Sequence, residues 1–94
     1  MKVRYTPAAL SDRERIFECL RERSADGARN VIASIRETVK RLEDQPLSGY
    51  RTDQPDIRVI FVIRYPYKIF YRVRDEVEIL HIRHTSRRAW AGEK

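Results

Sequence analysis

The sequence predicts an α+β domain in which two helices cover one face of an antiparallel sheet. Three observations indicate this class: an alternating segment at the N-terminus, apolar residues at helical spacing through the first half, and three strand-like runs in the second half. The expected order is an N-terminal strand, an antiparallel two-helix hairpin and a three-stranded antiparallel meander. Because the chain contains no internal repeat, low-complexity run or linker, residues 1–94 should form a single domain.

The N-terminal segment should be a short strand that leads directly into the first helix. Residues 2–6 (KVRYT) alternate in polarity, Thr6 is a suitable helix cap, and Pro7 suits a first helical turn. An apolar stripe then continues to about Arg23. Its members are Leu10, Phe17 and Leu20, with Ala9 and Ile16 beside them.

A second helix should follow after a short connection, so that the two helices pack as an antiparallel hairpin. Residues 24–27 (SADG) interrupt the first pattern, and Gln45-Pro46 marks the end of the second helix. The apolar residues of this helix recur at the spacing of a buried face, which places Ile35 and Val39 against the sheet. The complete stripe is Ala28, Val31, Ile32, Ile35, Val39 and Leu42.

The second half should contain a loop and then three strands joined by hairpins. Residues 47–56 include Gly49 and Pro55 and are expected to form the loop. The two connections between the strands, at residues 65–66 and 75–76, are short enough for tight hairpins. The predicted strands cover residues 58–64, 67–74 and 77–84.

Two-residue hairpins fix the register and divide the side chains between two faces. Arg64 would pair with Tyr67, and Arg74 with Val77. The face expected to contact the helices carries Ile60, Val62, Ile69, Tyr71, Val73, Leu80 and Ile82. The opposite face carries Val59, Phe61, Ile63, Lys68, Phe70, Arg72, Ile79, His81 and Arg83.

This opposite face brings basic residues together. In the predicted register Lys68 lies across from Arg83, and Phe70 lies across from His81. Like charges in direct register destabilise a sheet, so their presence suggests that the face binds an anion. The alternative is a solvated face on which arginine stems cover apolar area. The residues alone favour neither interpretation.

Composition excludes several classes of protein. The chain has 94 residues, of which 41% are hydrophobic and 36% charged, and its net charge is +6. Sixteen of its 20 basic residues are arginine, a bias that suits bidentate contacts to phosphate or carboxylate. No apolar run approaches the ~18 residues of a membrane span, and charges within residues 1–20 exclude a secretory signal. We therefore expect a cytoplasmic protein without membrane contact.

The sequence contains no recognisable metal, cofactor or nucleophile motif. His81 and His84 should point to opposite faces of a strand, so they cannot share a metal ion. Ser86 lacks the glycine-flanked turn of a hydrolase nucleophile, and the three glycines form no phosphate loop. The single cysteine, Cys19, cannot form an internal disulfide and is expected to be a buried, inert thiol.

Residues 85–94 form a basic tail with one tryptophan. Arg87 and Arg88 could hold nucleic-acid phosphate or only increase solubility. Trp90 is expected either to anchor the tail on the domain or to stack on a partner.

Two motifs of the second half are specific when taken together: the run Tyr-Pro-Tyr-x-Ile-Phe-Tyr-Arg-Val and the last strand, which ends in histidine. The segments that carry the likeness are Pro46 to Arg51, Ile57 to Val59, Arg64 to Val73 and Val77 to His84. The chain resembles toxins of the RelE/ParE superfamily, from bacterial type II toxin–antitoxin (plasmid stabilisation) modules. The helical half matches that superfamily only in pattern.

The resemblance implies a toxin that inhibits growth and is neutralised by a cognate antitoxin. That antitoxin would be ParD-like and acidic, so the net charge of +6 would favour rapid capture. The pattern favours the ParE branch, whose members poison DNA gyrase and are not known as nucleases. Target binding would then fall to the tail residues Arg87, Arg88 and Trp90.

The resemblance also leaves open a RelE-like endoribonuclease that cleaves mRNA in the ribosome. Such an enzyme needs a base, an acid and cations for the scissile phosphate. The groups available for these catalytic roles are Lys68, Arg72, His81 and Arg83. The RelE pattern usually has two lysines before the second strand and a tyrosine near the C-terminus, whereas this chain has no lysine between Lys40 and Lys68 and its last aromatic is Trp90. An inactive, purely binding member is the third possibility.

Overall fold

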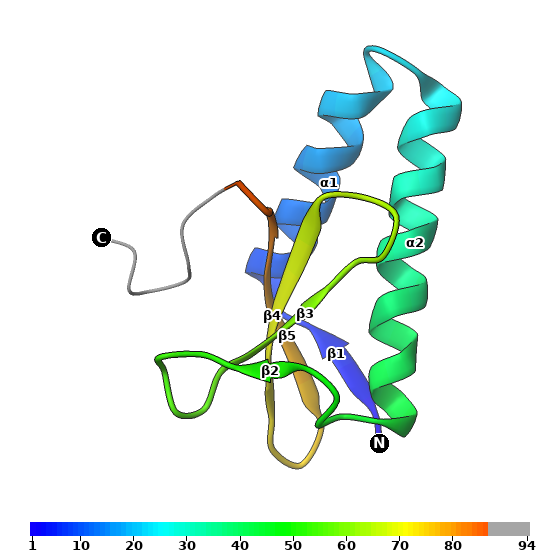
Figure 1. The fold of residues 1–94 in the computed structure, drawn as a ribbon. Helices are drawn as coiled ribbons and strands as arrows, with labels where there is room; N and C mark the ends of the chain where they lie inside the picture. The colour runs from blue at the N-terminus through cyan, green and yellow to red at the C-terminus, as the bar shows by residue number, and fades with distance from the viewer. Residues whose placement is uncertain (87–94) are drawn as a thin grey trace.

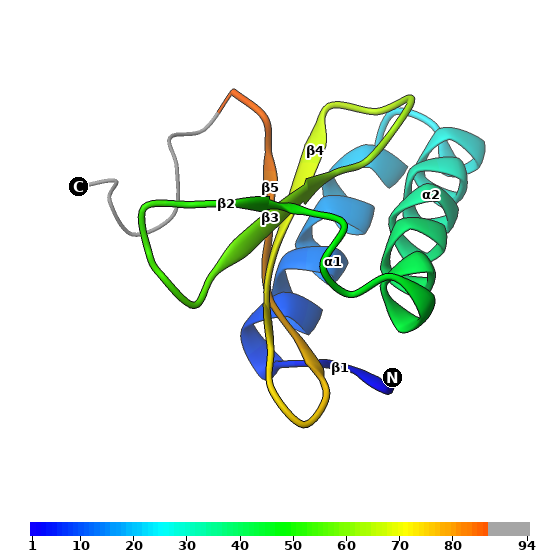
Figure 2. The same cartoon turned by 60° about the horizontal axis from the view of Figure 1, so that its bottom comes forward.

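A computed structural model describes residues 1–86 and places two helices on one side of a five-stranded sheet (Figure 1). The helices are α1 (Pro7–Arg21) and α2 (Ala25–Asp44). The strands are β1 (Val3–Tyr5), β2 (Tyr50–Arg51), β3 (Arg58–Phe61), β4 (Tyr67–Val73) and β5 (Val77–His84). Figure 2 shows that both helices cover the same face of the sheet, which confirms the predicted α+β class.

The sheet is mixed and has the strand order β1-β5-β4-β3-β2. The strands β3, β4 and β5 form the predicted antiparallel meander. In addition, β1 pairs in parallel with β5, with Val3 opposite Val77 and Tyr5 opposite Ile79. The edge strand β2 lies inside the segment that was expected to be a loop and pairs with β3. Each of these two short strands exists because a longer neighbour supplies its backbone partners.

Helix α1 begins where the sequence predicted, and the predicted residues Ala9, Ile16 and Leu20 lie in or against the core, although the core side is rotated away from Leu10. Thr6 caps the helix by accepting a hydrogen bond from the Ala9 N–H at 3.2 Å, and Pro7 occupies the first turn. The predicted stripe included Leu10, which is 38% exposed. The core side carries Ala9, Asp12, Ile16 and Leu20. The predicted stripe is rotated from the observed core side because the charged residue Asp12 occupies a buried position, which a search for apolar residues does not detect.

Helix α2 begins earlier than predicted, because residues 24–27 form its cap and first turn. The Ser24 hydroxyl accepts a hydrogen bond from the Gly27 N–H at 3.0 Å. The buried face is the predicted one, since Ile35 is 0% and Val39 5% exposed within the core against the sheet. Within residues 1–86, neither helix combines the length and the apolar character that a bilayer span needs.

The connection between β3 and β4 is longer than the predicted hairpin. Strand β3 ends at Phe61, so residues 62–66 form the connection, and Arg64 has a positive φ of 69°. As a result, Ile60 lies opposite Ile69 rather than opposite Tyr71. This displacement is even, so the side chains of β3 keep their predicted faces.

The register between β4 and β5 follows the prediction until a β-bulge intervenes. Phe70 lies opposite His81 as predicted, but the next pair joins Tyr71 to Ile79. Ile79, which was predicted on the face away from the helices, therefore lies in the core and is 0% exposed. Leu80, which was predicted in the core, is only half-buried. A bulge adds one residue to one strand and leaves no trace in a polarity pattern.

A buried tyrosine holds the segment after α2 against the sheet. Tyr71 is 0% exposed, and its hydroxyl accepts a hydrogen bond from the Gly49 N–H at 2.9 Å. Arg58 Nη1 donates to the Gly49 carbonyl, also at 2.9 Å. Burial raises the pKa of Tyr71 above its ordinary value. A Cβ on Gly49 would lie 2.5 Å from the Tyr71 hydroxyl, so only glycine permits this approach.

Candidate functional site

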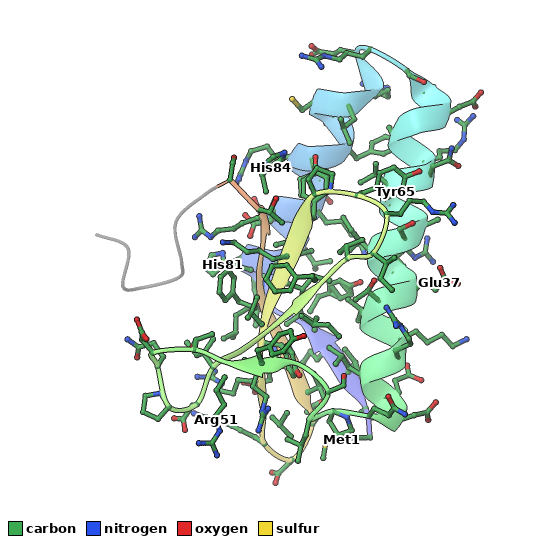
Figure 3. The ribbon with its side chains drawn as sticks, viewed as in Figure 1. Met1, Glu37, Arg51, Tyr65, His81 and His84 are labelled. Atoms are coloured by element: carbon green, nitrogen blue, oxygen red, sulfur yellow. The ribbon has the colours of Figure 1, made fainter. Side chains whose placement is uncertain are left out.

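The open face is the surface of the sheet that points away from the helices. Figure 3 shows His81 on this side and Glu37 on the outer side of α2. Two predicted juxtapositions are confirmed, because Lys68 lies opposite Arg83 and Phe70 lies opposite His81. The residues of the open face are Tyr50, Val59, Phe61, Lys68, Phe70, Arg72, Glu78, His81 and Arg83.

The centre of the open face is buried although neither helix covers it. Lys68 is 9% and Phe70 2% exposed. The Lys68 ammonium lies 5.7 Å from the centroid of the Phe70 ring, within the range of a cation–π contact. The Arg83 Nε is buried and has no acceptor among residues 1–86. Arg83 therefore carries a buried donor without an acceptor among these residues, directly across the sheet from Lys68.

Asp12 joins α1 to the free edge of β5. Its Oδ2 accepts a hydrogen bond from the Ile82 N–H at 3.0 Å and lies 2.9 Å from His81 Nδ1. Its Oδ1 accepts a hydrogen bond from Arg15 at 3.3 Å. Because a carboxylate only accepts hydrogen bonds, His81 Nδ1 carries the proton of their contact. Since β1 pairs only with the first part of β5, Asp12 satisfies a backbone donor that the edge would otherwise leave open.

Glu78 centres a second charged cluster at the start of β5. Its Oε1 accepts a hydrogen bond from Arg72 Nε at 2.7 Å, and its Oε2 accepts one from Arg4 Nη2 at 2.7 Å. The hydrogen bond from Arg72, together with that from Arg4, lowers the pKa of Glu78 below its ordinary value. Because these residues come from β4, β5 and β1, the cluster fastens three neighbouring strands.

Two of the four residues considered for catalysis are thus held by acidic residues of the same chain. Arg72 directs its Nε to Glu78, and His81 directs its Nδ1 to Asp12. A ribonuclease site needs cations aimed at the scissile phosphate and a base aimed at the attacking hydroxyl. The observed partners favour a role for Arg72 and His81 in bracing β5. The sequence signal for this arrangement was an acidic residue on the core side of α1, and pattern reasoning missed it.

An exposed aromatic pair forms the other end of the open face, toward β2. Tyr50 is 68% and Phe61 46% exposed, and their ring centroids lie 6.2 Å apart. Tyr50 lies on a strand that the sequence placed in a loop, so pattern reasoning did not identify this pair. Tyrosine is enriched among the residues that dominate binding interfaces.

His84 and Cys19 lie outside the open face. His84 Nδ1 accepts a hydrogen bond from the Ser86 N–H at 3.1 Å, and its ring stacks edge-on against Tyr67. Cys19 is exposed, which corrects the prediction of a buried thiol: the core side of α1 passes through its neighbour Leu20. In the part of the chain that the structure describes, no group of three or more His, Cys, Asp or Glu side chains could hold a metal ion. The tail residues Arg87, Arg88 and Trp90 lie outside the described residues.

Comparison with known proteins agrees with this architecture. The family model of the ParE toxin of the type II toxin–antitoxin system parDE matches residues 3–89. Y4kP of Sinorhizobium fredii (strain NBRC 101917 / NGR234), whose name describes it as a candidate toxin, is 31% identical over 83 residues, which cover 88% of this chain and 86% of Y4kP. A chain of the chromosomal ParDE system from P. aeruginosa superposes with a TM-score of 0.81 at 25% identity and covers 89% of this chain and 95% of its own length. The chain therefore belongs to the ParE family of type II toxin–antitoxin toxins.

Proposed function

We propose that this ParE-family toxin inhibits growth by binding DNA gyrase and trapping it on cleaved DNA. The observation that carries the proposal is the placement of Arg72 and His81, whose side chains are directed to Glu78 and Asp12. A binding toxin needs a stable surface rather than a set of groups ready for proton transfer. The open face supplies such a surface, with the exposed ring pair of Tyr50 and Phe61 at one end and Arg83 at the other.

A RelE-like ribonuclease is the second candidate, and one observation favours it. Lys68 lies opposite Arg83, and the Arg83 Nε has no acceptor among residues 1–86. Two cations in register would suit a phosphate. In a nuclease, loss of one such group should reduce the cleavage rate by ~10²–10³. In a gyrase poison, the same substitution removes at most one contact of a larger interface.

The gyrase proposal is tested with the purified chain, DNA gyrase and plasmid DNA. We expect the chain to inhibit supercoiling and to accumulate gyrase-linked cleaved plasmid, and we expect His81→Ala to retain both effects. Gyrase that supercoils normally at a saturating concentration of the chain would contradict the proposal. A parallel reaction with translating ribosomes and mRNA tests the nuclease alternative.

We also propose that the antitoxin binds along the helical hairpin beside β1. A groove of about 690 Å³ between β1 and α2 meets a second groove, of about 650 Å³, at Arg13. The guanidinium of Arg13 lies 4.6 Å from the centroid of the Tyr5 ring. The outer edge of β1 is free among the described strands, so an extended segment could pair with it. The apolar lining of the two grooves comprises Val3, Tyr5, Phe17, Ile32, Ala33 and Val39.

A single charged substitution in this groove tests the antitoxin surface. Ala33 is exposed on α2, so Ala33→Glu should leave the fold intact and weaken antitoxin binding by about tenfold or more. Ala8→Glu is the matched control, because Ala8 is also exposed and lies on α1 outside both grooves. Equal antitoxin affinity of the two variants would place the contact elsewhere.

A further inference from the structure

The connection between β3 and β4 projects two residues from a firmly held base. Val62 is 5% exposed within the core, and its N–H donates to the Tyr67 carbonyl at 2.9 Å. Tyr65 packs against the core, and the Pro66 carbonyl accepts a hydrogen bond from the Thr85 N–H at 2.8 Å. Residues 62, 65 and 66 thus anchor the connection on both sides of its tip. The tip consists of Ile63 and Arg64.

The tip exposes an apolar side chain in a strained backbone. Ile63 is 68% exposed, so its side chain gains little from the fold. Arg64 has a φ of 69°, in the left-handed region that is unfavourable for residues with a Cβ. Glycine or asparagine would adopt this conformation more readily, yet the connection contains neither. Strain of this kind is commonly stored at functional sites.

A polar hollow lies beside the tip, on α2. It has a volume of about 420 Å³ and lies where the β3–β4 connection passes alongside the helix (Figure 1). Two arginines, Arg41 and Arg64, line it together with one carboxylate, Glu37. Its remaining lining residues are Ser34, Thr38 and Ile63.

We infer that this tip, defined as Ile63 and Arg64 with the neighbouring Arg41, is a recognition surface for the protein target of the toxin. The two guanidinium groups suit a carboxylate of the partner, and Ile63 suits an apolar socket beside it. Because Glu37 offsets one of the two guanidinium charges, the hollow has a net charge of +1, which suits a single carboxylate on a protein better than the continuous charge of a nucleic-acid backbone. Because its base is anchored, the tip loses little conformational freedom on binding. The inference rests on the proposed function only in that the target is a protein.

The position of Arg64 allows recognition to be separated from folding. Arg64→Gly removes the guanidinium and also relieves the strain of the left-handed backbone. The melting temperature of this variant should therefore be equal to or above that of the wild type. Ile63→Ala removes an exposed side chain and should leave the melting temperature unchanged. We expect each variant to need about tenfold or more toxin for the same growth inhibition, while antitoxin affinity stays at the wild-type value. Arg23→Gln is the control, because Arg23 is exposed in the connection between α1 and α2.

Each other result overturns a definite part of the inference. Growth inhibition within twofold of the wild type in an Ile63→Ala, Arg64→Gly double variant would exclude a target contact. Parallel loss of antitoxin affinity would reassign the tip to the antitoxin, and loss of binding to a short DNA or RNA duplex would reassign it to nucleic acid. If the tip variants lose growth inhibition but the wild-type chain has no effect on gyrase, the gyrase proposal alone is refuted. A wild-type chain without effect on growth would refute both.

Discussion

Asp12 and Glu78 are two carboxylates with equal exposure and similarly charged neighbours but different structural roles. Each side chain is 12% exposed, and each lies between two basic side chains. Among residues 1–86, the Glu78 carboxylate accepts hydrogen bonds only from side chains, those of Arg4 and Arg72. Asp12 also accepts the backbone N–H of Ile82. Loss of Glu78 would leave arginines that can turn to water, whereas loss of Asp12 would leave a strand edge with an unsatisfied donor.

The difference follows from what covers each part of β5. Its first residues, Val77 to Ile79, pair with β1 on one side and β4 on the other. From Leu80 onward β1 no longer pairs with the strand, and α1 takes over through Thr6 and Asp12. Glu78 therefore reinforces a completed ladder, while Asp12 replaces a missing strand. Three of the four predictions below test this comparison, and the four are ordered from the largest expected effect to the smallest.

Removal of the Asp12 carboxylate should have the largest effect. Asp12→Ala leaves the Ile82 N–H without its acceptor, so the free energy of unfolding should fall by about 2–3 kcal/mol in urea titrations. Asp12→Asn keeps an acceptor for this N–H, so its free energy of unfolding should fall by clearly less. If Asp12→Ala and Glu78→Ala are equally destabilising, the backbone bond is not what distinguishes the two carboxylates.

The Tyr71 hydroxyl should contribute an intermediate amount and should account for sensitivity to alkali. Tyr71→Phe removes the hydrogen bond from Gly49 and should lower the free energy of unfolding by about 1 kcal/mol at neutral pH. Burial raises the pKa values of Tyr71 and Tyr67, so their neutral forms stabilise the fold below pH ~10, and this contribution is lost as the pH rises through the raised values. The loss of stability above pH ~10 should be smaller in Tyr71→Phe. An unchanged alkaline profile would contradict this assignment.

Glu78→Gln should have a smaller effect that depends on pH and salt. Because Arg72 and Arg4 lower the pKa of Glu78, its charge stabilises the fold above the ordinary carboxyl range. This contribution is lost as the pH falls through the lowered pKa. Melting temperatures of Glu78→Gln and the wild type should therefore differ at neutral pH and converge in acid, and 1 M salt should narrow the neutral difference. A difference that persists unchanged at low pH would rule out the ion pairs as its source.

Arg15→Gln should have the smallest effect. Its side chain is 70% exposed, so its contact with Asp12 should be worth no more than about 0.5 kcal/mol. If Arg15→Gln lowers the free energy of unfolding as much as Asp12→Ala does, the stabilisation by Asp12 comes from its contact with Arg15 rather than from its hydrogen bond to β5.

Features determined by local polarity could be predicted from the sequence. The stripe of α2, with Ile35 and Val39 toward the sheet, follows from helical spacing. The faces of β3 and the pairing of Lys68 with Arg83 follow from strand alternation, which an even register displacement preserves. The basic residues of the open face, together with Phe61 and Phe70, could therefore be placed before the structure was known.

Features determined by contacts between distant segments could not be predicted in this way. The bulge at Leu80 changes no polarity, and β1 pairs with a strand more than seventy residues away. The role of Asp12 could not be predicted for the same reason, because its partner Ile82 lies on a strand that reaches α1 only in the folded chain. The position of Tyr50 opposite Val59 likewise depends on the close approach of the Tyr71 hydroxyl to Gly49.

The central claim is that this toxin acts by binding rather than by cleaving RNA. The most direct test is to map RNA 5′ ends and gyrase-linked DNA breaks in the same cells. After induction of the chain without its antitoxin, we predict intact mRNA and an accumulation of DNA breaks covalently linked to gyrase. Induction of His81→Ala should give the same breaks, because the account assigns His81 to its contact with Asp12 and to no catalytic step. New RNA ends at translated codons that disappear in Arg83→Ala, without gyrase-linked breaks, would contradict the account and identify the open face as a nuclease centre.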